Sequence, residues 1–266
     1  MNITNTNTSF KARCVQVRDA DWVCRAINHT LPHHSTTKHQ ARIIDYLERN
    51  KSIIKFDKTP TNQTEVYEIL LNTKLPSKYN NIQKFLNGIK YSLEKLADNR
   101  LKAEVIMKGE RLFQSLFMTE MYKTGNCTEN AIIAELILKM NNINNACCAA
   151  IYKGTKNAPQ KDWIDIDHAV CVFNIDGTPF SEKITKNTII IDPWAGKAGF
   201  AKDMEKFYRD ELSKYFKIQD NEVFKYERAS MVNIPDYIMA KLKDKYKPFI
   251  FTNKNRKFMK TANNNK

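Results

Sequence analysis

The stretch KTGNCTENAIIAELILKM, residues 123–140, places a turn and a single cysteine directly before an apolar periodic segment. Gly125 and Asn126 supply the turn, and residues 132–140 have the pattern of a helix. Cys127 therefore stands where a helix is expected to start. A thiol there is either a small buried apolar residue or a nucleophile, because a helix N-terminus favours the thiolate form.

Before this stretch the sequence predicts mainly helices. Residues 1–35 carry little periodicity, a helix is expected to start near residues 35–37, and residues 59–72 predict a short helix. Residues 79–99 give the clearest pattern, because apolar residues recur there at i, i+3 or i+4, and i+7. A similar pattern covers residues 101–121.

After Cys127 the pattern changes to short apolar runs. Residues 146–152, 168–175 and 188–194 have strand length and are bounded by Asn, Gly, Pro or Asp, which is typical of antiparallel strands. Further helices are expected at 203–217 and 235–245. This order predicts an α+β fold. We divide the chain into a helical N-terminal region (1–120), a core (121–250) and a basic tail expected to be disordered (251–266).

The composition is that of a soluble globular protein. The chain has 266 residues, of which 42% are hydrophobic and 27% charged, and no apolar run approaches the length of a membrane span. The N-terminus lacks the apolar centre of a secretory signal. The net charge of +14 suits an acidic partner, but the lysines are scattered, so we expect no nucleic-acid partner.

The cysteines and histidines do not predict a metal site or a disulfide framework. No CxxC pair occurs, and the cysteines that lie in apolar runs are expected in the core: Cys147, Cys148 and Cys171. Four histidines gather between positions 29 and 39, but Pro32 interrupts the helix that would align His29 and His33. We predict no metal and no organic cofactor.

One histidine and one aspartate complete a possible catalytic group with Cys127. His168 begins one apolar run, and Asp192 ends another directly before Pro193. An imidazole on a strand can take the thiol proton and pass it to a leaving amine, while a carboxylate fixes the tautomer of the imidazole. Trp194 would shield the group from water.

Three motifs carry a resemblance to a known superfamily. GNCTENA (125–131), DHAVCVF (167–173) and IIDPWAG (190–196) resemble the Cys–His–Asp hydrolases of the papain-like and transglutaminase-like superfamily. The branch most similar is that of bacterial effectors and toxins, which includes protein-glutamine deamidases and thiol proteases. The resemblance implies Cys127 as nucleophile, His168 as base and Asp192 as orienting acid, with Asn126 and Trp194 as supporting or oxyanion residues. It also implies a central helix that carries the cysteine and packs on an antiparallel sheet.

The resulting hypothesis is a cysteine hydrolase that acts on protein amide bonds through a thioester intermediate. Glutamine deamidation or transglutamination is the first reading, because the loop 176–187 and Trp194 are expected to narrow access to the thiol. Papain-like proteolysis is the alternative, and a non-catalytic basic protein-binding module is the alternative of another class. The helical region would recognise the substrate, a protein of a host, or brace the core. The resemblance also implies the bacterial cytoplasm, with delivery to a host cytosol by a specialised secretion system.

Overall fold

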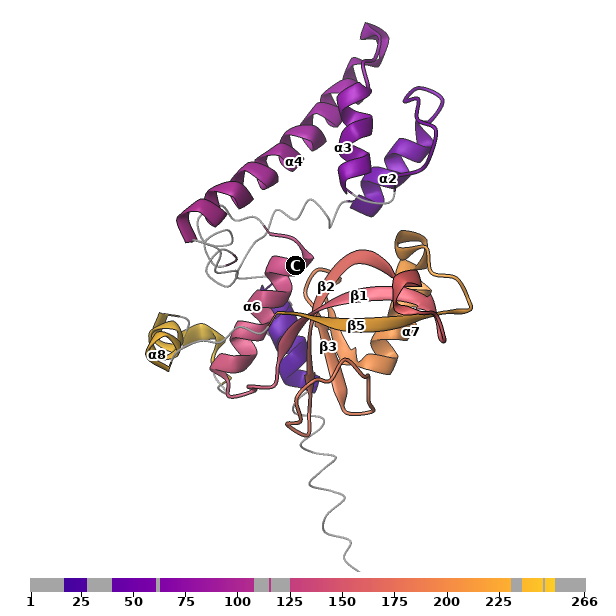
Figure 1. Cartoon of the computed structure of the whole chain (residues 1–266). Coiled ribbons are helices and arrows are strands. Elements are labelled where there is room, and N and C mark those ends of the chain that lie inside the picture. The colour runs from indigo at the N-terminus through magenta and orange to yellow at the C-terminus, as the bar shows by residue number, and fades with distance from the viewer. Residues whose placement is uncertain are drawn as a thin grey trace, which may run out of the picture. The chain divides into compact units, whose positions relative to one another are not determined.

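A computed structural model describes residues 17–27, 40–60, 63–107, 115, 125–230, 236–245 and 247–251. It combines helices with an antiparallel sheet, which confirms the α+β class (Figure 1). The chain forms two compact units, one of residues 33–126 and one of residues 1–32 together with 127–266. The unit of residues 33–126 is called the helical unit below, and the other is called the sheet unit.

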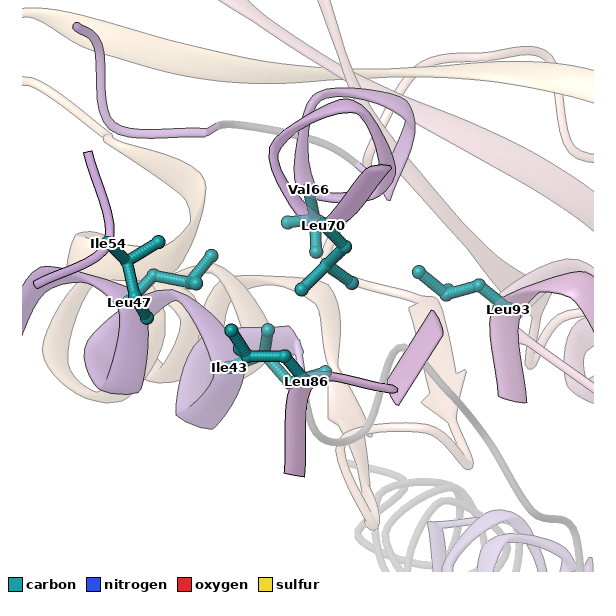
Figure 2. Packing of buried hydrophobic residues seen from close by; sticks show 7 residues of the cluster. All are labelled: Ile43, Leu47, Ile54, Val66, Leu70, Leu86 and Leu93. Atoms are coloured by element: carbon teal, nitrogen blue, oxygen red, sulfur yellow. The ribbon is translucent and has the colours of Figure 1, made fainter. Parts of the chain in front are cut away.

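The helical unit is built on helices whose apolar residues repeat at helical spacing. Its helices are α2 (Gln40–Arg49), α3 (Gln63–Asn72) and α4 (Asn80–Met107), with the short 3-10 helix η2 (Ser77–Tyr79) before α4. Side chains from three helices and the turn after α2 converge in one core (Figure 2), formed by Ile43, Leu47, Ile54, Val66, Leu70, Leu86 and Leu93. The helices predicted at 59–72 and 79–99 are confirmed, and α2 follows the helix start expected near residues 35–37. Residues 35–39 and most of the predicted helical stretch 101–121 lie outside the described residues.

The sheet unit contains one five-stranded antiparallel sheet in the order β4-β3-β2-β1-β5. Its strands are β1 (Cys147–Thr155), β2 (Ile164–Asn174), β3 (Thr188–Asp192), β4 (Lys197–Phe200) and β5 (Glu222–Ser230). The three predicted strands are confirmed. The cysteines expected in the core are buried, at 0–2% exposure for Cys147, Cys148 and Cys171.

Helix α6 (Cys127–Met140) packs on β1, β2 and β3 and is buried at every position except Thr128. A helix that is apolar on all sides belongs in a core. Two of its charged residues pair with each other, since Lys139 Nζ lies 2.7 Å from Glu135 Oε1. The other oxygen of Glu135 accepts the backbone N–H of Cys148 at 3.0 Å, which ties α6 to β1. The start of α6 is thereby held at a fixed place over the sheet.

The remaining helices of the sheet unit lie beside this core. Helix α7 (Ala201–Phe216) contacts β3 and β4, and α8 (Asp236–Lys245) contacts α6. The described part of the unit also contains two short 3-10 helices, η4 (Gln160–Asp162) and η5 (Lys247–Phe249). None of the described helices is long and apolar enough to cross a membrane.

A helix at residues 17–27 also belongs to the sheet unit, in a segment where the sequence carries little periodicity. Trp22 packs edge-on against Phe251, with ring centroids 5.3 Å apart. The Cys24 thiol donates to the backbone carbonyl of Asp192 at 3.5 Å. These contacts join residues about 170 to 230 positions apart and tie the N-terminal segment to the sheet unit. The helical unit therefore begins after residue 32, whereas the helical region predicted from the sequence spans residues 1–120. Residues 252–266 and the histidines at 29–39 lie outside the described residues.

Candidate active site

Cys127 is the first residue of α6 and is nearly buried, at 7% exposure. Its thiol points to the backbone carbonyl of Asp167, with Sγ and the carbonyl oxygen 3.8 Å apart. It also lies close enough to His168 to raise the pKa of the imidazole. The helix start and the strand that carries the histidine therefore meet at the sulfur atom.

His168 is directed by an irregularity in β2. Ala150 pairs with Ala169, whereas Tyr152 pairs with Asp165, so a single residue of β1 faces three residues of β2. Asp167 adopts a left-handed conformation there, with φ 54°, and its N–H donates to Asp165 Oδ1 at 2.8 Å. Bulges of this kind re-aim side chains next to functional sites. The bulge thus sets the direction of His168, which is 4% exposed.

The left-handed residue gives a first prediction. Asp167→Val should lower the free energy of unfolding by about 1–2 kcal/mol, because a β-branched residue is strained at positive φ. Asp167→Gly is the matched control, since glycine adopts that conformation without strain. Thermal and denaturant unfolding of both variants measures the difference. Equal stability of the two variants would show that the bulge does not require this conformation.

Asp192 ends β3 and is fully buried, with both carboxylate oxygens engaged. Oδ2 lies 2.7 Å from His168 Nε2 and also accepts the Tyr208 hydroxyl at 3.0 Å. Oδ1 accepts the backbone N–H of Ala195 at 2.9 Å. Hydrogen bonds to a buried carboxylate are stronger than those between neutral groups. The carboxylate is therefore fixed in orientation from three sides.

The charge of His168 follows from these contacts. Burial alone lowers the pKa of His168, but the charge and hydrogen bond of Asp192, and then the contact with Cys127, raise the pKa from 6.5 to about 10. The imidazole is therefore protonated at neutral pH. Since Nε2 is held by Asp192, Nδ1 is the ring nitrogen that remains for the thiol.

Aromatic rings surround the imidazole. The centroid of the Trp194 ring lies 4.8 Å from that of His168, and the Phe216 ring lies at 5.2 Å. Trp194 is 6% exposed, and its role in shielding the group from water stays a prediction. Phe216 and Tyr208 were not predicted, because both belong to the amphipathic helix α7, where apolar spacing indicates only a core position.

Two other expectations are not tested. The loop 176–187 follows Asn174, six residues or about 20 Å along β2 from His168, and its effect on access to the thiol stays a prediction. Asn126 precedes Cys127 in the chain and is buried, and it falls in the helical unit. Its role as an oxyanion donor stays a prediction.

The structure thus brings Cys127, His168 and Asp192 together, although they lie far apart in the sequence. Within the described residues, no group of three His, Cys, Asp or Glu side chains is placed to hold a metal ion. Comparisons of the chain with known protein families, with curated proteins and with solved structures find no match. The geometry of the site is therefore the basis of the functional argument.

Proposed function

We propose that this protein is a cysteine-dependent amidohydrolase or acyltransferase with a papain-like or transglutaminase-like core. It acts on the side-chain amide of glutamine in a protein substrate and passes through a thioester intermediate. The observation that carries the proposal is the buried bond of 2.7 Å between His168 Nε2 and Asp192 Oδ2, with Cys127 close enough to raise the pKa of the same imidazole.

The geometry suits nucleophilic attack on an amide. Cys127 Sγ bonds to the carbonyl carbon, and the N–H groups at the start of α6 stabilise the negative oxygen of the tetrahedral intermediate. His168 gives its proton to the amide nitrogen, the C–N bond breaks, and ammonia leaves a thioester on Cys127. Water or an amine then attacks the thioester with His168 as the base, and the thiol is released.

The protonated state of His168 favours an amide as the substrate. An amide nitrogen leaves only when it receives a proton, and an imidazolium beside the sulfur can supply it. Because Asp192 holds His168 Nε2, Nδ1 faces the thiol during every step of the reaction. The aromatic rings around the imidazole keep bulk water from competing for this proton.

The limited exposure of Cys127 favours side-chain chemistry over proteolysis. The thiol is 7% exposed, and Trp194 covers one side of the imidazole. A single extended glutamine side chain reaches such a sulfur atom more readily than a peptide bond, because the substrate chain continues on both sides of that bond. Proteolysis remains the alternative outcome of the test.

Intact-mass spectrometry tests this proposal. A mixture of candidate substrate proteins is incubated with wild type or Cys127→Ala, with and without an added primary amine. Conversion of an amide to an acid, or attachment of the amine, that requires Cys127 supports the proposal. Fragments that require Cys127 would replace it with proteolysis. Unchanged proteins together with an unreactive Cys127 would favour a non-catalytic binding module.

A further inference from the structure

We propose that Tyr208 is a positioning residue of this site, which acts on His168 through Asp192. Its hydroxyl shares Oδ2 with the imidazole and so limits how strongly the carboxylate holds the imidazole proton. The inference rests on the proposed function, because it assigns a role within that catalytic group. No sequence motif pointed to this residue.

The Tyr208 hydroxyl makes a direct hydrogen bond with the carboxylate of Asp192. Tyr208 Oη lies 3.0 Å from Asp192 Oδ2, the same oxygen that lies 2.7 Å from His168 Nε2. Tyr208 is fully buried, as is Asp192. Burial and the charge of Asp192 raise the pKa of Tyr208 well above its usual range, so the hydroxyl keeps its proton and donates it. The oxygen is therefore shared permanently between two donors.

Sharing an acceptor weakens its hold on each donor. A hydrogen bond from a neutral hydroxyl takes part of the negative charge that would otherwise attract the imidazolium. Without the hydroxyl, His168 is the one side-chain donor that the described residues supply to Oδ2, and Asp192 is fully buried. The carboxylate itself stays in place, because Ala195 still binds Oδ1. The main effect of removing the hydroxyl is therefore electrostatic.

Few other titratable groups among the described residues face this pair. Cys127 approaches His168 from α6, and Cys24 reaches the backbone of Asp192 from the helix at 17–27. Tyr226 of β5 is close enough to Asp192 to feel its charge. None of these groups shares Oδ2 by a described hydrogen bond, so Tyr208 is the one to vary first.

Tyr226 provides a matched control. It is fully buried like Tyr208, but its hydroxyl has no hydrogen-bond partner among the described residues. Removing an unbonded hydroxyl is close to neutral. Tyr208→Phe and Tyr226→Phe therefore delete the same atom from two similar environments, and only the first deletion changes a contact of Asp192.

The experiment measures the rate of iodoacetamide alkylation at Cys127 as a function of pH, in wild type and both variants. In Tyr208→Phe the imidazole holds the thiol proton more firmly, so we expect the midpoint of the profile to move to lower pH by about half a unit to one unit. We expect the Tyr226→Phe profile to overlay that of wild type. The low-field proton NMR signal of the His168–Asp192 bond should move downfield in Tyr208→Phe alone.

Three results would overturn the inference. A Tyr208→Phe profile equal to that of wild type would show that the hydroxyl fills space without affecting the charge of Asp192. A shift to higher pH would show that the hydroxyl orients the carboxylate and does not weaken its hold on the imidazole proton. An equal shift in Tyr226→Phe would show a general effect of removing a buried hydroxyl. These results leave the proposed function intact. A wild-type Cys127 no more reactive than the buried Cys171 would instead refute the proposed function, and this inference with it.

Discussion

Cys127→Ala and His168→Gln are each expected to reduce amide turnover by about 10⁵-fold or more. Without the sulfur no thioester forms, and without the imidazole neither the thiol nor the leaving nitrogen exchanges its proton. The two changes together should cost little more than either one, because members of one catalytic group act as a unit. Turnover of the purified variants on a substrate identified by intact mass measures the effect.

Two controls separate this loss from a loss of folding. Cys171→Ala removes a fully buried thiol from the strand that carries His168 and should leave turnover near normal. Glutamine is chosen at position 168 because an alanine would leave the buried Asp192 charge unpaired, which costs about 3–5 kcal/mol. A folded His168→Gln variant with near-normal turnover would contradict the assignment of the base.

Asp192→Asn is expected to lower turnover by about 10³–10⁴-fold, which leaves more activity than the loss of Cys127. An asparagine that keeps its oxygen toward the Ala195 N–H presents its NH₂ group to Nε2. His168 must then accept at Nε2 and carry its proton on Nδ1, the nitrogen needed for the thiol. The wrong tautomer is the reason for the loss.

The same variant also changes the pH dependence. Asp192 is the main group that raises the pKa of His168 against the opposing effect of burial, so its replacement lowers that pKa from about 10. The imidazolium then loses its proton at a lower pH, so the alkaline limb of the pH–turnover profile should move to lower pH. The pH–rate profiles of wild type and Asp192→Asn measure this shift. An unchanged alkaline limb would show that His168 does not control it.

Local patterns were sufficient to predict most of the elements. Helix α4 was predicted from its apolar spacing, and β1, β2 and β3 from short apolar runs bounded by turn residues. The strand β5 was missed because Glu222 breaks its apolar alternation. That residue is buried by pairing with Lys153, at 3.2 Å, which the sequence alone cannot reveal. The four-residue β4 is too short to carry a pattern.

The site could be predicted only where chemistry marks a residue. Cys127, His168 and Asp192 stand out because a reactive side chain begins or ends an apolar run. Tyr208 looks like any core residue of an amphipathic helix, and its contact with Asp192 depends on how α7 meets β3. The bulge at Asp167 depends on the register between β1 and β2. Long-range pairing fixes both features, and no local pattern encodes it.

The central claim is that His168 and Asp192 activate Cys127, and site-resolved alkylation tests it most directly. The rates of iodoacetamide labelling are measured for the cysteines that the structure describes, Cys24, Cys127, Cys147, Cys148 and Cys171, in wild type and His168→Gln. At neutral pH we expect Cys127 to react fastest in wild type and to lose this advantage in His168→Gln. Above about pH 9, where ordinary thiols ionise, the Cys127 rates of the two proteins should converge. Convergence would show that iodoacetamide reaches the thiol equally well in both proteins. Equal rates at Cys127 in both proteins at neutral pH, or a Cys127 no faster than Cys171, would contradict the account.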